Sequence, residues 1–518
     1  MDQSRKVVLI IAGLTLVLVV VALQVLRGMG NGAPTGQATG ASNKTLPNVL
    51  LVIADDMGVD KLGVYAQDVD GDYANTATAL PLTPTLDGLA AQGVRFTDAW
   101  ANPSCSPTRA TLYTGLHAFR HGVGTAIGGP MSTSGLDPDL TTLAEIMGHA
   151  RYESALFGKW HLGEGDVPDT WGTGEDWIDH LGETVTTDIG PAHHGYDMFG
   201  GSLFGALDVD GGGYESWTLL TTVHPGVTRV LAVEETTYAT SQQVDDAARW
   251  IRSRTRPWFV TLAFNAPHSP WEAPPEDCRY TTASPTTDVT AYQAMVECMD
   301  MELGRLIDSI PELRDTVILF VGDNGTDASL AEEVFDDGRG KNTLYESGVR
   351  VPLIVADGWT LSGSTGGMGP GPGASGRNLA VHDAGREVAD PVHVVDLFAT
   401  IGELAGADTS TGVDSTSLVP LLRDTSGDVP VYAYTELYMT EGTGSAALRY
   451  DAHKLIVTVE RQASGLCRSA YELYNVVSDR HEWTDLSASD PDTLATLTAL
   501  IDELAASEEG AWLDVSDC

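Results

Sequence analysis

Uninterrupted runs of apolar residues that end in polar residues recur along the chain. The first run spans residues 49–54 and holds no polar position, so a strand there is expected to be covered on both faces, as in a parallel sheet. Ligands of such sheets gather where the strands end, so the polar residues after each run are candidates for a functional site. Further strands are expected at 94–100, 152–163, 257–268, 316–325 and 352–357.

Helical periodicity occupies the segments between these runs. Alternating strands and helices predict an α/β domain, which we place at residues 47–425. The segment 288–310 repeats apolar residues at the spacing of a helix that faces a core, namely at Met295, Met299, Leu303, Leu306, Ile307 and Ile310. The other helices are expected at 83–93, 141–150, 240–254 and 392–406.

A different pattern begins at about residue 430. Short strands are expected at 448–451, 453–460 and 471–476, and a helix follows at 493–507. This change predicts a second, smaller α+β domain at residues 426–518.

The N-terminal region carries an uncharged apolar run at residues 7–26, just long enough to cross a bilayer as a helix. Arg5 and Lys6 precede this run, which predicts that residues 1–6 stay cytoplasmic and that the remainder is exported and membrane-anchored. A cleaved signal peptide, which would give a secreted or periplasmic protein, is the alternative. Residues 27–46 are expected to form a flexible linker.

Charge and cysteine content limit the partners and the compartment. The chain has 72 acidic and 29 basic residues, and the net charge of −43 argues against nucleic acid as a partner. Setting Cys105 aside leaves Cys278, Cys298, Cys467 and Cys518, which allow three pairings. Proximity along the chain favours Cys278–Cys298 and Cys467–Cys518, and disulfides fit an exported protein.

Cys105 stands directly before a helical segment that opens with a proline, in the sequence CSPTR. The unpaired N–H groups at a helix start favour anions, and Arg109 adds a fixed positive charge one turn later. Such surroundings suit a thiolate or a site that handles an anionic group. A buried structural cysteine is the alternative for this motif taken alone.

One acidic pair and one Asp-Asn pair follow apolar runs. Asp55 and Asp56 come directly after the first strand, and Asp323 and Asn324 end the strand at 316–325. The adjacent carboxylates of Asp55 and Asp56 repel each other unless a cation lies between them, so these two residues are candidate metal ligands. A solvated loop or a helix cap is the alternative.

Three further residues can act on an anionic substrate. Lys159 and His161 provide a cation and an imidazole at the end of the strand at 152–163. The third residue is His268, whose backbone is restrained by a proline on either side. Taken singly, such residues more often lie in surface loops without a task.

Several segments, taken together and in order, resemble the formylglycine-dependent, arylsulfatase-like sulfatases of the alkaline phosphatase superfamily. The resemblance covers most of residues 47–510. Ser347 stands where the family segment usually has a glycine, a departure that changes no expected ligand. The segments are NVLLVIADDMG, CSPTR, GKWHLG, APHSP, DNG and GKNTLYESGVRVP.

The resemblance implies an alkaline-phosphatase-like large mixed sheet flanked by helices, with a small C-terminal domain made of an antiparallel sheet and a helix. It also implies that a formylglycine-generating enzyme oxidises Cys105 to Cα-formylglycine, whose hydrate attacks the substrate sulfur. A calcium ion, with magnesium as the alternative, is expected to be bound by Asp55, Asp56, Cys105, Asp323 and Asn324.

The remaining roles are implied in the same way. Arg109 and Lys159 would hold the hydrated aldehyde and neutralise sulfate oxygens. His268 and Lys341 would contact the ester and help to protonate the departing oxygen, and His161 would take a proton when sulfate is expelled.

The implied activity is hydrolysis of a sulfated small molecule or glycan, either a carbohydrate sulfate or an aryl sulfate, with release of inorganic sulfate. The membrane is expected as a partner only through the N-terminal helix. A phosphate or phosphonate ester hydrolase of the same superfamily is the alternative. An inactive glycan-binding protein is the less favoured one, because a binding protein needs no aldehyde.

Overall fold

Lys44–Cys518 form one compact unit. The predicted membrane-spanning segment at 7–26 and the residue Cys518 lie outside the described part of the chain. Among the residues that are described, no helix is both long and apolar enough to cross a bilayer. The computed structural model describes residues 46–506 except 67–79, 129–134, 164–183, 187–189, 208–211, 223–228, 282, 331–337, 362–380, 382, 410–412, 425–428, 439–442 and 463–464.

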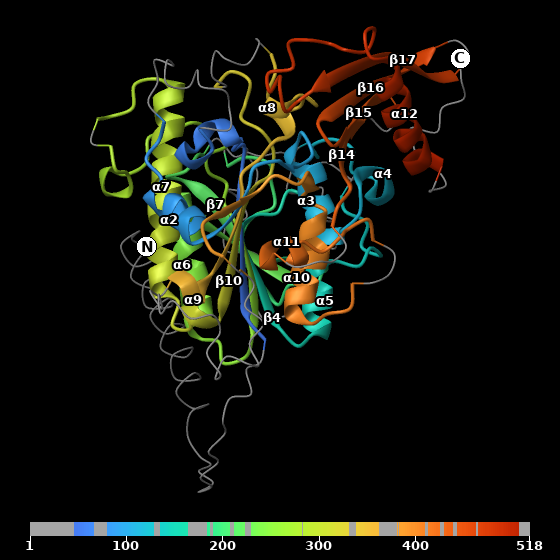
Figure 1. Cartoon of the computed structure of the whole chain (residues 1–518). Coiled ribbons are helices and arrows are strands. Elements are labelled where there is room, and N and C mark those ends of the chain that lie inside the picture. Colours follow the sequence, from blue (N-terminus) through green and yellow to red (C-terminus); the bar gives the residue numbers. More distant parts are fainter. Residues whose placement is uncertain are drawn as a thin grey trace, which may run out of the picture. The chain divides into compact units, whose positions relative to one another are not determined.

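A mixed sheet of eleven strands forms the centre of the described chain (Figure 1). Its order is β12-β2-β11-β10-β1-β9-β4-β6-β7-β8-β5. The strands are β1 (Asn48–Ala54), β2 (Gly93–Phe96), β4 (Glu153–Lys159), β5 (Thr184–Thr186), β6 (Met198–Ser202), β7 (Trp217–Thr222), β8 (Arg229–Glu235), β9 (Trp258–Ala263), β10 (Thr316–Gly322), β11 (Leu353–Asp357) and β12 (Arg386–Val388).

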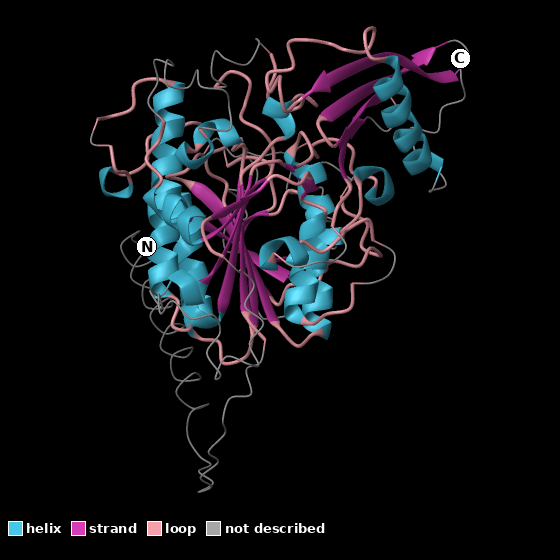
Figure 2. Cartoon of the chain, viewed as in Figure 1, coloured by secondary structure: helices cyan, strands magenta, loops and turns pink. Residues whose placement is uncertain are grey.

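Helices cover both faces of this sheet (Figure 2). The α-helices of this part are α2 (Pro84–Gln92), α3 (Cys105–Thr114), α4 (Ala118–His121), α5 (Leu143–His149), α6 (Ala239–Arg252), α7 (Asp288–Ser309), α8 (Glu346–Val349), α9 (Gly358–Leu361), α10 (Asp396–Ala405) and α11 (Val419–Arg423). The short 3₁₀ helices are η1 (Val59–Lys61), η2 (Gly63–Tyr65), η6 (Glu276–Cys278) and η7 (Leu313–Asp315).

The central strand β1 shows why the first apolar run has no polar position. Successive side chains of a strand point to opposite faces. Val49, Leu51 and Ile53 pack in one core with α3, α5 and α10, whereas Leu50 and Val52 pack in a second core with α2, α6 and α7. Every residue of β1 is buried, which confirms the expected covered strand.

The C-terminal part of the chain forms a second, four-stranded antiparallel sheet. Its helix packs on one face of this sheet, and the other face packs against Trp100 and Val349 of the preceding part. The predicted architecture of a large mixed sheet with a small antiparallel sheet and a helix is confirmed, while the boundary between residues 425 and 426 stays a prediction. The elements are β14 (Tyr432–Tyr438), β15 (Gly444–Tyr450), β16 (His453–Gln462), β17 (Gly465–Asn475) and α12 (Pro491–Ala506).

Two of the expected elements differ in kind from the sequence prediction. The strand expected at 94–100 is divided into β2 and β3 (Ala99–Trp100), and β3 pairs in a separate sheet with β13 (Val392–His393). The helix expected at 392–406 therefore begins only at Asp396, whose carboxylate accepts the backbone N–H of His393 at 3.0 Å. Periodicity alone does not separate a strand from a helix in so short an apolar run, so the pattern could not place this change.

A disulfide joins Cys278 to Cys298, as the proximity argument predicted. The second expected pair lies outside the described residues, because it requires Cys518. Cross-linking residues that lie 20 apart in sequence restricts the unfolded chain. The double variant Cys278→Ala/Cys298→Ala is expected to lose about 3 kcal/mol of unfolding free energy, measured by urea denaturation. An unchanged urea midpoint would contradict a stabilising role for this bond.

Candidate functional site

Four neighbouring parallel strands end at one edge of the large sheet. These strands are β4, β9, β1 and β10, in that order across the sheet. Parallel strands bring their carboxyl ends to the same edge, which is where α/β proteins place ligands. The residues at or just after these ends are Asp55, Asp56, Lys159, His161, His268, Asp323 and Asn324.

The acidic residues of this edge contact one another directly and are all buried. The backbone N–H of Asp56 donates to Oδ1 of Asp323 at 3.0 Å, and the amide of Asn324 donates to Oδ1 of Asp56 at 2.8 Å. Asp56 has a φ of 66°, in the left-handed region that Asp and Asn tolerate better than most residues. The Tyr292 hydroxyl donates to the Asp56 carbonyl at 2.8 Å and so holds this turn.

Cys105 is the first residue of α3, and Pro107 lies in the first turn of that helix. The Cys105 side chain is buried and is not part of a disulfide. Its Sγ and carboxylate oxygens of Asp55 and Asp323 lie within 4.8 Å of one another. One turn later, Arg109 donates from Nε and Nη2 to Oδ2 of Asp323 at 3.1 and 2.8 Å. The start of α3 therefore lies against Asp55 and Asp323, which together with Asp56 we call the acidic cluster.

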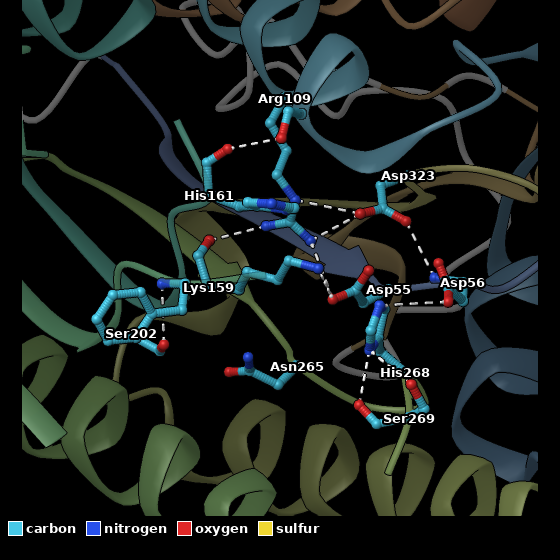
Figure 3. Close-up of polar contacts among 12 residues, drawn as sticks. Asp55, Asp56, Arg109, Lys159, His161, Ser202, Asn265, His268, Ser269 and Asp323 are labelled. Atoms are coloured by element: carbon cyan, nitrogen blue, oxygen red, sulfur yellow. Dashed lines mark hydrogen bonds and ion pairs between the residues drawn. The ribbon is translucent and has the colours of Figure 1, made fainter. Parts of the chain in front are cut away.

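Three cations neutralise these carboxylates, and Figure 3 shows two of them, Arg109 and Lys159. Nζ of Lys159 lies 2.5 Å from Oδ2 of Asp55, and Nη2 of Arg109 lies 3.8 Å from the same oxygen. Nζ of Lys341 lies 2.6 Å from Oδ1 of Asp56. Arg109 also donates from Nη1 to the Lys159 carbonyl at 2.8 Å, so the two cations are held relative to each other.

Two histidines have fixed tautomers. Nδ1 of His268 lies 2.7 Å from the carbonyl oxygen of Ser269 and therefore carries the proton, while Nε2 lies 3.7 Å from Oδ2 of Asp56. Nε2 of His161 lies 2.7 Å from the carbonyl oxygen of Ile127. This contact assigns the His161 proton to Nε2 and leaves Nδ1 as the basic nitrogen. Nδ1 is buried and has no hydrogen-bond partner among the described residues.

Ser106 connects His161 to α3, a role that the sequence reasoning missed. Its hydroxyl donates to the His161 carbonyl at 2.9 Å and accepts the backbone N–H of Ile127 at 3.0 Å. The same Ile127 residue accepts the proton of the His161 ring. Ser106 stands inside the CSPTR motif, but nothing in its spacing indicates these contacts.

The protonation states of the basic residues differ. Burial lowers the pKa of His268 to about 4, although Asp56 acts in the opposite direction. Burial, reinforced by Lys159, lowers the pKa of His161 well below its ordinary value. Burial alone would lower the pKa of Lys341, but its ion pair with Asp56 outweighs burial and raises the pKa. At neutral pH both imidazoles are therefore neutral, and Lys341 is the charged donor.

The donor set fits a hard divalent cation. Oδ1 of Asp55 and Oδ1 of Asn324 are buried and have no hydrogen-bond partner among the described residues. A buried acceptor without a donor is costly, and a cation among these oxygens would remove that cost. Burial and the neighbouring Asp323 raise the pKa of Asp55, although Lys159 lies beside it. Carboxylate and amide oxygens are the ligands that calcium and magnesium take in proteins.

The structure brings the predicted residues together at one edge of the sheet. Lys341 reaches it from the loop before α8, and His161 is joined to α3 through Ser106. Tyr292 is a residue that sequence reasoning did not select, because its aromatic ring lies in the core pattern of α7. The roles of all these side chains stay predictions.

Known proteins similar to this chain are sulfatases. The family model named Sulfatase matches residues 47–407. Steryl-sulfatase of Mus musculus is 28% identical over 507 residues, which cover 82% of this chain and 70% of that protein. Arylsulfatase A of Homo sapiens is 29% identical over 442 residues, which cover 80% of this chain and 76% of that protein.

Solved structures share the fold. The protein Ps i-CgsB, solved in complex with k-i-k-neocarrahexaose, matches with a TM-score of 0.66 and 24% identity over 89% of this chain and 92% of its own. A protein solved with its substrate, D-glucosamine-2-N,6-O-disulfate, matches with a TM-score of 0.63 and 17% identity over 91% of this chain and 100% of its own. These likenesses support the expected alkaline-phosphatase-like fold.

Proposed function

Because the chain belongs to the sulfatase family and is a sulfuric ester hydrolase, we propose that it releases inorganic sulfate from sulfated carbohydrates. The reaction uses a formylglycine derived from Cys105 and a bound divalent cation. The observation that carries this proposal is the position of Cys105 at the start of α3, with Sγ within 4.8 Å of carboxylate oxygens of Asp55 and Asp323.

The cation would be held by Asp55, Asp56, Asp323 and Asn324, with a further ligand from residue 105. Calcium is the expected ion, and magnesium is the alternative. When bound, it supplies Lewis-acid charge that offsets the negative charge of a sulfate oxygen. The three carboxylates are already balanced by three side-chain cations, so a metal ion adds positive charge that an anionic substrate then offsets.

The aldehyde, as its hydrate, supplies a hydroxyl that displaces the alcohol from sulfur. The helix start carries Cys105 next to Arg109, while Lys159 approaches from the end of β4. These two cations are fixed by Asp323 and Asp55 and neutralise sulfate oxygens without having to reorganise.

Proton transfer is divided between Lys341 and His161, while His268 contacts the ester. Lys341, charged at neutral pH, donates to the departing oxygen, and His268 lies beside it at Asp56. The unpaired Nδ1 of His161 accepts a proton when sulfate leaves, because Nε2 is already committed to the Ile127 carbonyl.

The substrate class and location are further parts of the proposal. Ps i-CgsB and the structure with a doubly sulfated glucosamine both hold sugar ligands, which supports a carbohydrate sulfate. We further propose that the chain is exported and anchored through residues 7–26, or secreted after cleavage. A formylglycine-generating enzyme is its maturation partner.

Peptide mass measurement tests the modification. The chain, produced together with a formylglycine-generating enzyme, is expected to yield a tryptic peptide ending at Arg109 whose mass matches the aldehyde or its hydrate. The same preparation is expected to release sulfate from sulfated sugars and to leave matched phosphate esters nearly untouched. An unmodified Cys105, with a control sulfatase modified in the same cells, would contradict the proposal.

A further inference from the structure

We propose that the C-terminal sheet is part of the catalytic apparatus because it positions Lys341, through contacts that we call the latch. Here the C-terminal sheet means β14–β17, and residues 481–482, which follow β17, take part in the same contacts. The latch holds residues 339–346, the loop that carries Lys341 and leads into α8 (Figure 1). The latch contacts join three residues of this loop to three residues of the C-terminal part of the chain. The loop residues are Arg339, Tyr345 and Glu346, and their partners include Lys454, Glu472 and Glu482.

The centre of the latch is a buried ion triplet. Nζ of Lys454, on β16, lies 3.3 Å from Oε1 of Glu346 and 2.8 Å from Oε1 of Glu482. Glu482 also accepts the backbone N–H of Glu346 through Oε2 at 2.6 Å. All three side chains are at most 3% exposed, so a loss of Lys454 would leave two buried carboxylates without their shared cation. The start of α8 is thereby fixed to the C-terminal sheet.

Two more contacts hold the loop on either side of Lys341. Nη1 of Arg339 donates to the carbonyl oxygens of His481 and Glu482 at 2.7 and 2.9 Å. The Tyr345 hydroxyl donates to Oε2 of Glu472 at 2.9 Å, and the Arg339 guanidinium lies 4.0 Å from the centre of the Tyr345 ring. The C-terminal part of the chain therefore contacts the loop before and after its catalytic lysine.

The opposite side of the same loop contacts the segments at the edge of the large sheet where the candidate site lies. The backbone N–H of Lys341 donates to the carbonyl of Thr326 at 2.9 Å, two residues after Asn324. The backbone N–H of Asn342 donates to the carbonyl of Pro103 at 2.7 Å, two residues before Cys105. The loop thus lies between the C-terminal sheet and the segments that carry the acidic cluster and the nucleophile.

Contacts outside the latch also join the C-terminal sheet to the preceding part of the chain. The Tyr438 hydroxyl donates to the carbonyl of Ala118 at 2.8 Å, and Arg449 donates to Asp98 at 2.7 Å. These contacts connect the C-terminal sheet to other segments and do not involve residues 339–346. Buried ion pairs add little net stability but fix a geometry, which is what a lysine that must reach a departing oxygen requires.

A measurable consequence follows from the role of Lys341, and it rests on the proposed function. A lysine that helps to protonate the departing oxygen matters most when that oxygen is strongly basic. Displacing Lys341 is therefore expected to slow the hydrolysis of sulfate esters of weakly acidic alcohols more than that of sulfate esters of acidic phenols. If the latch only held the two parts of the chain together, breaking it would change both hydrolysis rates by the same factor.

Arg339→Gln is the main test, with phenyl sulfate and 4-nitrophenyl sulfate as substrates. The variant is expected to lower kcat for phenyl sulfate about tenfold and kcat for 4-nitrophenyl sulfate less than about twofold. Arg339→Lys, which keeps a charged donor, is expected to restore most of the loss. Tyr345→Phe is expected to show the same preference on a smaller scale, because it removes the contact with Glu472.

Tyr438→Phe is the matched control, because it also removes one hydroxyl contact between the C-terminal sheet and the rest of the chain. It is expected to leave the ratio of the two rates unchanged. Equal losses for both esters in Arg339→Gln and Tyr345→Phe would overturn the latch while leaving the proposed function intact. Wild-type protein that carries formylglycine but releases no sulfate from sulfated sugars or from either ester would instead overturn the proposed function, and the role of the latch with it.

Discussion

Replacing Cys105 with alanine is expected to abolish sulfate release and to leave the fold intact. Alanine cannot be oxidised to an aldehyde, so the variant has no nucleophile at the start of α3. The expected loss in kcat is roughly 10⁴-fold or more, as when a covalent nucleophile is removed from other hydrolases. Sulfate released from a sulfated sugar, quantified by ion chromatography, measures this effect.

Stability measurements separate the loss of chemistry from the loss of structure. Cys105 is 2% exposed, so removal of one sulfur atom is expected to cost about 1 kcal/mol, read from the urea midpoint. Cys105→Ser is a second variant, since it keeps a hydroxyl but lacks two oxygens on one carbon. It is expected to release at most one equivalent of alcohol per protein molecule. Sustained turnover by either variant would exclude Cys105 as the source of the nucleophile.

The fold and the location of the site could be predicted because they depend on local patterns. The run from Val49 to Ala54 is apolar on both faces, and the polar residues that follow it must then lie at a sheet edge. The same reasoning applied to β10 places Asp323 at a strand end, and in the structure it accepts the backbone N–H of Asp56. Alternation of strands and helices likewise predicted the layers.

Side-chain contacts between residues that are distant in the sequence could not be predicted from the same patterns. The proton of His161 is assigned by the Ile127 carbonyl, a contact between residues 34 positions apart, in a loop with no signal of its own. The latch depends on Lys454, which stands in a strand pattern where a lysine usually faces solvent. Its burial arises only when the C-terminal sheet meets the loop of Lys341.

Replacing Asp55 with asparagine is expected to weaken both the metal site and catalysis. The change keeps the size of the side chain and one oxygen donor, but it removes the charge that faces Lys159 at 2.5 Å and Arg109 at 3.8 Å. With one negative charge fewer, the site repels a divalent cation more strongly. We expect kcat to fall roughly 10²–10³-fold, because charge stabilisation in a buried site is lost.

Calcium binding provides a measurement that does not depend on turnover. At a concentration 100 times its Kd, calcium is expected to stabilise the wild-type protein by about 2.7 kcal/mol, visible as a rise in Tm after removal of metal with a chelator. Asp55→Asn is expected to show a much smaller rise at the same calcium concentration, because its affinity is lower.

Asp300→Asn is the matched control for this prediction. Asp300 is also fully buried, but it accepts the backbone N–H groups of Thr85 and Leu86 at 3.0 and 2.8 Å, at the start of α2 and outside the site. It is expected to lower Tm without changing the calcium-dependent rise or the sulfate release per folded molecule. An equal calcium response in Asp55→Asn and wild type would remove Asp55 from the metal site. A loss of response in Asp300→Asn would show instead that the calcium effect reports general stability, and the acidic cluster would then lose its assignment as the binding site.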